Sequence, residues 1–296
     1  MTRPILPFSS EWINEYETYP YVRGNWETTD NEENFKRILP KISKYIDWKW
    51  KNRSIDYVVN NCGLRINENI NDDYDFSETY VVLGCSFARG TGVSSDETIS
   101  AWVERLSGVK TLNFGNSGAG CDTVFYNILW LFTKPKPPKK VFVLWPEISR
   151  FSQFKLSVSD TGRIICSDPS HQLSVRHGVH NNRKFNIEHF IHPELQANNK
   201  RMWQHIMHST WGSSIVELDI IDTSEYNLTF NKTAHAELGW MNRTALSKEE
   251  IINEYCARDI QEDSIKRVFE ENRITAGACH WGNLQHKIIA EWFLAQ

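Results

Sequence analysis

The sequence lacks several features that would place it in a broad functional class. Its 296 residues contain no apolar run of about 18 or more, so no segment is expected to cross a membrane as a helix. Basic residues (33) do not outnumber acidic ones (37), so the chain lacks the excess of positive charge that is typical of nucleic-acid-binding proteins. It also has no G-x-x-x-x-G-K-S/T loop for a nucleotide phosphate. Membrane spans, nucleic-acid partners and a Walker-type site are therefore not expected.

Cysteine is sparse, and the six cysteines include no C-x-x-C pair. The first residues, MTRPILPFSSEW, contain no long apolar stretch of the kind that a secretory signal needs. We therefore expect free thiols in a reducing compartment and a cytoplasmic location. Four Asn-x-Ser/Thr sites are then expected to be incidental; they are Asn52, Asn227, Asn231 and Asn242.

Metal ligands are poorly grouped as well. Two histidine pairs, His189/His192 and His205/His208, have the i, i+3 spacing that places both side chains on one helix face. Neither pair is accompanied by a third well-spaced ligand, and a polar helix face explains the spacing more simply. We expect no metal and no cofactor.

The chain does have the composition of a globular protein, with 40% hydrophobic and 24% charged residues. Its length suits one large domain or one domain with an extension. Twelve tryptophans are many for this length. Large side chains of the core and groove walls are the general explanation, and surfaces that stack on sugars are the more specific one.

Two parts of the chain differ in pattern. Residues 1–78 are rich in aromatic and acidic residues without a clear period, and we expect an N-terminal extension that packs on the main domain. Within it, the pattern predicts a helix over 34–50, with Pro40 as a start or break, and a short strand or hairpin over 55–66.

From residue 79 onward, strand and helix patterns alternate. Short apolar runs predict strands, and segments with helical spacing follow them. This order favours a parallel sheet with helices on both faces, in a domain of residues 79–296 with an insertion at about 151–245. Strands are predicted at 79–84, 109–115, 140–147 and 213–221, and helices at 94–108, 122–132, 187–209, 246–260 and 283–296.

Three loops that contain glycine or histidine hold the candidate catalytic residues. Ser86 follows the first core strand, at the sheet edge where ligands bind in open α/β folds. Gly115 ends the second strand, so its N–H, with that of Ser86, is a candidate donor to an oxyanion. His280 precedes the last helix and is a candidate base for Ser86, ahead of His286 within that helix. Turn chemistry alone would also explain the glycines.

These stretches resemble the SGNH hydrolases, also called the GDSL esterase/lipase superfamily, in a branch common in phage and bacterial genomes. Gly84-Cys85-Ser86 is similar to the Gly-Asp-Ser nucleophile block, the segment around Gly115 to the oxyanion block, and His280 to the histidine of the last block. The resemblance covers residues 79–145 and 275–296, and 55–66 weakly. It implies a three-layer α/β/α sandwich with a flavodoxin-like sheet.

The chain departs from the family pattern at two places. The aspartate three residues before the histidine is replaced by Gly277, and the third block ends Trp145-Pro146-Glu147 without the usual asparagine. A missing orienting acid lowers the rate by about four orders of magnitude, and a missing oxyanion donor costs roughly 2.7–4 kcal/mol. A backbone carbonyl near Ala276 is one substitute for the acid; three carboxylates are the others, namely Glu147, Asp222 and Asp259.

The resemblance therefore implies an esterase that removes a small acyl group, such as O-acetyl on a carbohydrate, with Ser86 and His280 as a catalytic dyad. Acyl transfer would use the same residues. The alternative is a non-catalytic binding or virion-associated protein on a degenerate SGNH scaffold. The residues expected to line the pocket are Cys85, Asn116, Trp145, Glu147 and Trp281.

Overall fold

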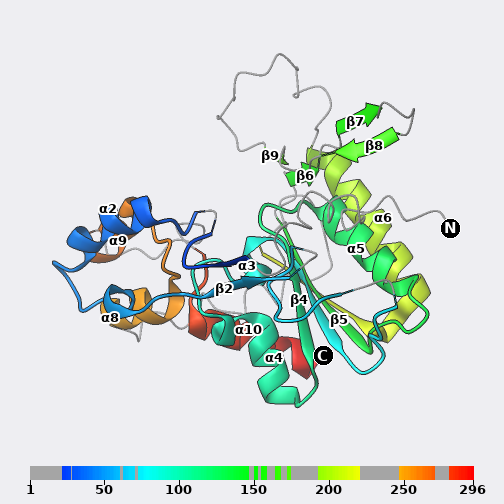
Figure 1. Cartoon of the computed structure of the whole chain (residues 1–296), viewed down its shortest axis with the longest axis horizontal. Helices are drawn as coiled ribbons and strands as arrows, with labels where there is room; N and C mark the ends of the chain where they lie inside the picture. Colours follow the sequence, from blue (N-terminus) through cyan, green and yellow to red (C-terminus); the bar gives the residue numbers. More distant parts are fainter. Residues whose placement is uncertain are drawn as a thin grey trace.

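A computed structural model of the chain has a parallel four-stranded sheet with helices on both of its faces, the arrangement of a three-layer α/β/α fold (Figure 1). Its described residues are 22–27, 29–60, 63–70, 73–146, 150–152, 155–158, 164–167, 172–174, 193–220, 247–270 and 280–296. Within them, no helix is long and apolar enough to span a membrane.

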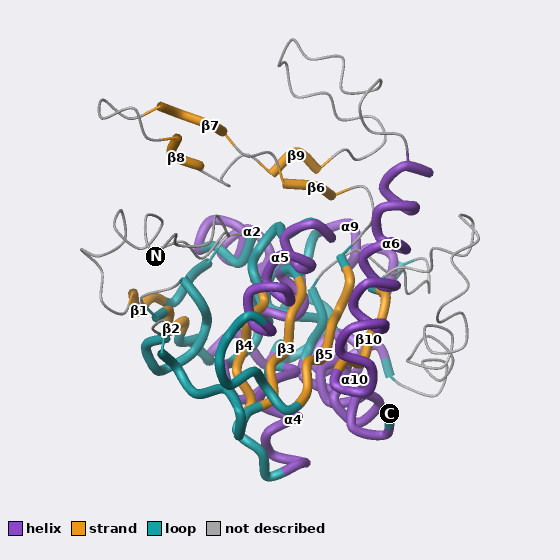
Figure 2. Tube along the Cα trace, turned by 90° about the vertical axis from the view of Figure 1, so that its right-hand side faces the viewer, coloured by secondary structure: helices purple, strands orange, loops and turns teal. Residues whose placement is uncertain are grey.

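The sheet forms from the apolar runs that the sequence predicts as strands. Its members are β3 (Tyr80–Gly84), β4 (Thr111–Gly115), β5 (Lys140–Trp145) and β10 (Ile215–Asp219). Their order across the sheet is β10-β5-β3-β4, and all neighbours are parallel (Figure 2). In chain order this is 2-1-3-4, the first four strands of the flavodoxin-like order, so the strand order reverses between β3 and β5.

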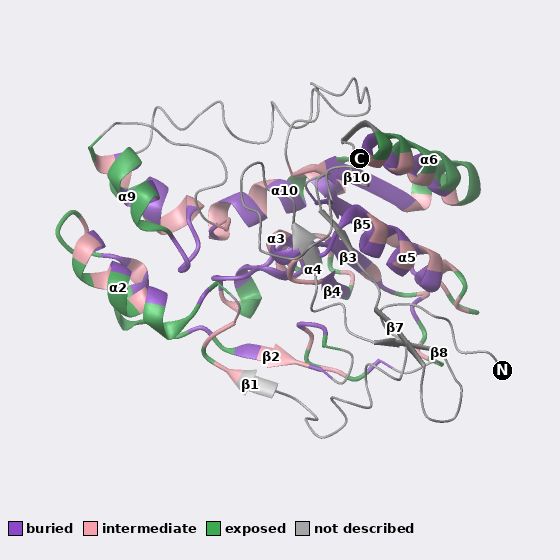
Figure 3. Cartoon of the chain, turned by 90° about the horizontal axis from the view of Figure 1, so that it is seen from above, coloured by how far each residue is buried: buried purple, intermediate pink, exposed green. Residues whose placement is uncertain are grey.

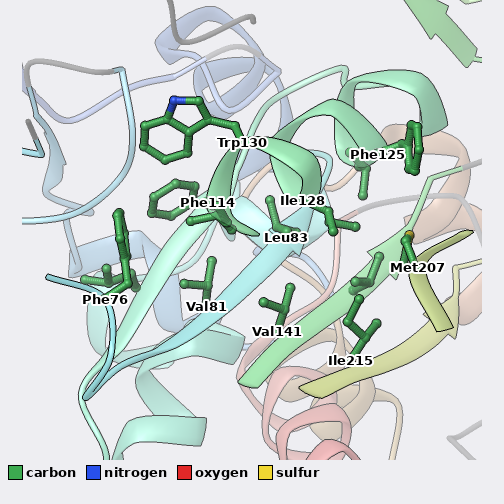
Figure 4. Close-up of a cluster of buried hydrophobic side chains, with 14 of the residues drawn as sticks. Phe76, Val81, Leu83, Phe114, Phe125, Ile128, Trp130, Val141, Met207 and Ile215 are labelled. Carbon is green, nitrogen blue, oxygen red and sulfur yellow. The ribbon is translucent and has the colours of Figure 1, made fainter. Parts of the chain in front are cut away.

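Helices cover both faces because the strand residues alternate in direction. Val81 and Leu83 of β3 join the cluster on one face, whereas Val82 joins the cluster on the other. The first face carries α5 (Cys121–Phe132) and α6 (Pro193–Trp211); the second carries α4 (Ile99–Ser107) and α10 (Asn283–Ala295). Figure 4 shows the first cluster, in which Phe114 and Val141 of the sheet pack with Ile128 and Trp130 of α5.

A third hydrophobic cluster joins the N-terminal segment to the segment before the last helix. Ile38, Trp48 and Trp50 pack there with Ile252 and Ile260. Figure 3 shows α2 and α9 beside each other at one end of the molecule, each with an exposed side. The elements of this region are β1 (Val22–Gly24), α2 (Glu32–Ile42), a 3-10 turn (Lys49–Asn52), β2 (Tyr57–Val59), α8 (Lys248–Glu250), a π-helical turn (Ile251–Tyr255) and α9 (Glu262–Phe269).

Several predicted helix bounds need correction. Pro40 lies inside α2, two residues before its end, and Asn31 caps the start instead. Ser94 and Glu97 form a capping box around a 3-10 turn (Ser95–Glu97), so the helix predicted over 94–108 begins only at Ile99, as α4. The helix predicted over 246–260 stops at Tyr255, because Cys256 forms a β-bridge with Trp281.

The remaining described elements are short. Two antiparallel strand pairs follow the sheet strand β5, namely β6 (Arg150–Ser152) with β9 (Gln172–Ser174) and β7 (Lys155–Val158) with β8 (Ile164–Ser167). A 3-10 turn (Gly212–Ser214) connects α6 to β10. The part of the predicted helix over 187–209 that precedes Pro193 lies outside the described residues.

Candidate active site

Ser86 lies at the carboxyl end of β3, as the first residue of the short helix α3 (Ser86–Arg89). Gly84 makes the tight passage from strand to helix possible. Its φ is 157°, and a Cβ there would meet both the Ala88 Cβ and the Leu144 carbonyl oxygen at 2.7 Å. The β3–β5 boundary, where the strand order reverses, therefore presents a serine hydroxyl at the edge where ligands bind in such sheets.

His280 comes to Ser86 from 194 residues further along the chain. Its Nε2 lies 2.7 Å from the Ser86 Oγ. The loop is fixed on the other side, because the Ala257 N–H donates to the His280 carbonyl at 3.0 Å and Trp281 pairs with Cys256. The nucleophile-to-base distance is that of a direct hydrogen bond.

Asp259 is the acid that completes the arrangement. Its Oδ2 lies 2.5 Å from the His280 Nδ1, and its Oδ1 accepts the His280 backbone N–H at 3.3 Å. An ionised carboxylate can only accept hydrogen bonds, so Nδ1 carries the imidazole proton and Nε2 is left to accept the Ser86 hydroxyl proton. Asp259 is one of the three carboxylates named from the sequence; Glu147, Asp222, Ala276 and Gly277 lie outside the described residues.

The charge on Asp259 is stabilised in spite of deep burial. Burial by itself raises the pKa of this carboxyl, whose side chain is only 3% exposed. The His280 imidazole and the hydrogen bonds from His280 and Thr29 outweigh it, so that the pKa lies below its usual value. The group is therefore held as a carboxylate, the form that orients a histidine base.

The oxyanion side differs from the sequence-based prediction. Gly115 N–H donates to the Asn113 Oδ1 at 2.9 Å, so it is not free to bind an oxyanion in this arrangement. Glycine is required at position 115 for a different reason. A Cβ there would lie 2.1 Å from the Arg89 backbone N of α3, so any other residue would clash with that helix. Ser86 N–H remains as a donor, since it lies at the first position of a helix and lacks an intrahelical acceptor.

The predicted pocket residues divide into two groups. Cys85 and Trp145 are fully buried, and Trp145 Nε1 donates to the Glu217 Oε2 at 2.6 Å, so both belong to the packed interior and the prediction was wrong for them. Asn116 and Trp281 are half-buried at the carboxyl edge, and Glu147 lies outside the described residues.

Phe87 was not singled out from the sequence, although it directly follows the serine. Its ring lies 4.7 Å from the His280 ring and 4.6 Å from the Trp281 ring, measured between centroids. Phe87 and Trp281 are both partly exposed, so an aromatic surface borders the nucleophile and the base. Adjacency to Ser86 in the sequence was the available signal.

His286 has a structural role instead of a catalytic one. It is fully buried in α10, and its Nε2 lies 3.0 Å from the Trp281 carbonyl oxygen. Burial lowers the pKa of His286 to about 3, so the imidazole is neutral and donates from Nε2 to that carbonyl.

The histidine pair at His205 and His208 likewise forms no metal site. His208 Nε2 contacts the Glu217 Oε1 at 2.6 Å, and His205 is exposed. Over the described ranges, no group of three or more His, Cys, Asp or Glu side chains is arranged to hold a metal ion. His189 and His192 lie outside those ranges.

No model of a protein family matches this chain, and no curated protein matches its sequence. The geometry of Ser86, His280 and Asp259 is therefore the feature of the chain that points to a function.

Proposed function

We propose that this chain is a serine hydrolase of the SGNH type, acting on a small acyl ester. The observation that carries the proposal is the hydrogen-bonded series from Ser86 Oγ to His280 Nε2 (2.7 Å) and from His280 Nδ1 to Asp259 Oδ2 (2.5 Å). Nucleophile, base and orienting acid in this geometry are the working parts of acyl transfer. The serine after the first sheet strand and the histidine before the last helix support the SGNH assignment.

The reaction would proceed in two halves. Ser86 Oγ attacks the acyl carbon while His280 Nε2 takes its proton, and the Ser86 N–H donates to the developing oxyanion. His280 then protonates the departing alcohol, which leaves an acyl group on Ser86. A water molecule, deprotonated by the same imidazole, cleaves that ester and restores the serine. Asp259 stabilises the imidazolium in both halves.

The acid differs in position from the SGNH pattern, and this bears on the alternative function. Two departures suggested a non-catalytic scaffold: Gly277, where the pattern has an aspartate, and the missing asparagine of the third block. Asp259 in contact with His280 offers an acid in place of the first. The half-buried rings of Phe87 and Trp281 suit the apolar face of a sugar, which supports an O-acetyl carbohydrate as substrate.

The test compares Ser86→Ala with the wild type on p-nitrophenyl acetate and on a serine-directed phosphonate. We expect turnover to fall by about four to six orders of magnitude, since a triad serine is removed, and covalent labelling to disappear. Ser100→Ala, at a buried serine of α4, is the matched control and should keep both. Turnover or labelling that persists in Ser86→Ala would contradict the proposal. Transfer of the acyl group from Ser86 to an added alcohol, in place of water, would identify an acyltransferase.

A further inference from the structure

The proposed catalytic acid, Asp259, receives a third hydrogen bond, from a part of the chain that lies far away in sequence. Thr29 Oγ1 donates to the Asp259 Oδ2 at 2.7 Å, across 230 positions. This is the same carboxylate oxygen that lies 2.5 Å from the His280 Nδ1. The threonine hydroxyl thus acts on the atom that orients the base.

Thr29 belongs to a short turn, which we call the strap and define by Glu27, Thr29 and Asp30. Two backbone hydrogen bonds of 2.9 Å close it, one in each direction between Glu27 and Asp30. Such a pair of bonds holds Glu27 and Asp30 against each other, and the Thr29 hydroxyl between them is oriented by its own bond to Asp259.

The two ends of the strap hold the elements that carry the acid and the nucleophile. Asp30 accepts from Arg258, the residue before Asp259, through Nε and Nη2 at 2.8 Å each. Glu27 Oε1 accepts from the Arg89 Nε at 2.5 Å, and Arg89 ends the helix that begins with Ser86. Arg258, Asp30 and Arg89 are buried, so these pairs are shielded from solvent.

We infer that Thr29 is a positioning residue of the active site, supplied by the strap, whose hydroxyl fixes the Asp259 carboxylate for His280. The inference rests on the proposed function, which it deepens by adding a fourth member to the Ser86–His280–Asp259 series. The ionisable groups that act on Asp259 are His280 and Asp30, and Asp30 is itself paired with Arg258. We expect these contacts to stay in place when only the Thr29 hydroxyl is removed.

The experiment compares Thr29→Val with Thr29→Ser. In Thr29→Val, Asp259 loses one of the donors that stabilise its carboxylate. We expect kcat/KM to fall roughly tenfold, the effect of one hydrogen bond to a charged group. The low-pH limb of kcat/KM should move to higher pH, because the Asp259 pKa rises when the Thr29 hydrogen bond that lowers it is lost. Thr29→Ser keeps the hydroxyl and should restore the wild-type profile. Thr29→Ala also removes the hydroxyl, and it does so without the extra methyl group that valine places at the position of the hydroxyl.

A second readout does not depend on turnover. The downfield proton resonance of His280 Nδ1–H, assigned by its loss in His280→Gln, reports the bond to Asp259 directly. It should move in Thr29→Val and stay in place in Thr29→Ser. Thr210→Val, which removes a hydroxyl that donates to the Ile206 carbonyl on α6, is the matched control and should change neither readout.

Two results would overturn the inference: a wild-type profile and resonance in Thr29→Val, or equal changes in Thr29→Val and Thr29→Ser. The proposed function fails separately, through activity that survives Ser86→Ala. The resonance would still decide whether Thr29 fixes the His280–Asp259 bond in that case.

Discussion

Two corners of the molecule bury networks of polar side chains, and they are built differently. The corner that holds the proposed catalytic residues, which we call the catalytic corner, brings Ser86, His280, Asp259 and Thr29 together from four separate segments. The other, which we call the α6 corner, consists of Lys200, Gln204 and His208 of α6, Glu217 and Asp219 of β10, and Trp145 of β5.

The α6 corner follows from local periodicity. Its helix residues recur every four positions and its strand residues every two, so each set lies on one face of its element. No sequence period predicts the catalytic corner, because its acid and base lie in loops at the ends of helices and strands. None of the six residues that define the α6 corner is a serine or a cysteine, so we expect the burial of charge there to serve stability. Variants of the two corners should therefore separate activity from stability.

The largest effect is expected for Asp259→Asn. The amide leaves the volume unchanged, but its nitrogen cannot accept a hydrogen bond, so the imidazole loses the partner that fixes its tautomer. We expect kcat on p-nitrophenyl acetate to fall by about four orders of magnitude, with a thermal midpoint within a few degrees of the wild type. Burst kinetics measures kcat, and calorimetry measures the thermal midpoint. An active Asp259→Asn enzyme would show that another group orients His280.

The next largest effect falls on stability. Lys200 is 1% exposed and forms an ion pair with Asp219, whose side chain is 15% exposed. Lys200→Met removes the buried ammonium from that half-buried carboxylate, and breaking such a pair destabilises by at most about 3–5 kcal/mol, the range for fully buried pairs. Urea unfolding should show this loss, while kcat stays at the wild-type value.

The double variant Lys200→Met/Asp219→Leu is the control for this prediction. Replacing both members of a buried ion pair by apolar groups is often neutral or stabilising, so most of the lost stability should return. A kcat that falls in step with stability in either variant would mean that the two corners are not separate.

The comparison also explains how far the sequence alone could lead. The four strands and the helices around them were predictable, because their apolar periods match the burial that the sheet imposes. Ser86 and His280 were predictable from their places at strand and helix ends. Asp259 could only be named as one of three carboxylates, and Thr29 not at all, since their contacts span 21 and 230 positions. Gly115 was misassigned because a glycine needed for the approach of α3 looks like one that serves a ligand.

The smallest predicted effect contrasts two histidines through pH. Burial lowers the pKa of His286 to about 3, against about 6.5 when unfolded. The unfolded chain then binds the extra proton between these values, so the His286 contribution is complete above pH 6.5 and declines as the pH falls toward 3. At pH 5 the loss is about 2 kcal/mol, from 1.36 kcal/mol for each unit. His286→Gln keeps a donor for the Trp281 carbonyl and should flatten the stability curve over this range.

His208 provides the control of opposite sign. The hydrogen bond to Glu217 is the largest effect on its pKa and raises it above 6.5, so its contribution to stability is complete below pH 6.5 and declines as the pH rises through the folded value. Its side chain is 44% exposed, so solvent screens the pair and the change in stability is smaller than that at His286. Urea unfolding from pH 5 to 8 should therefore show that the two histidines change the free energy of unfolding with pH in opposite directions. His286→Gln and His208→Gln should each abolish the pH dependence contributed by the histidine that they replace. Equal curves for His286→Gln and the wild type would mean that His286 is accessible to protons in the folded chain.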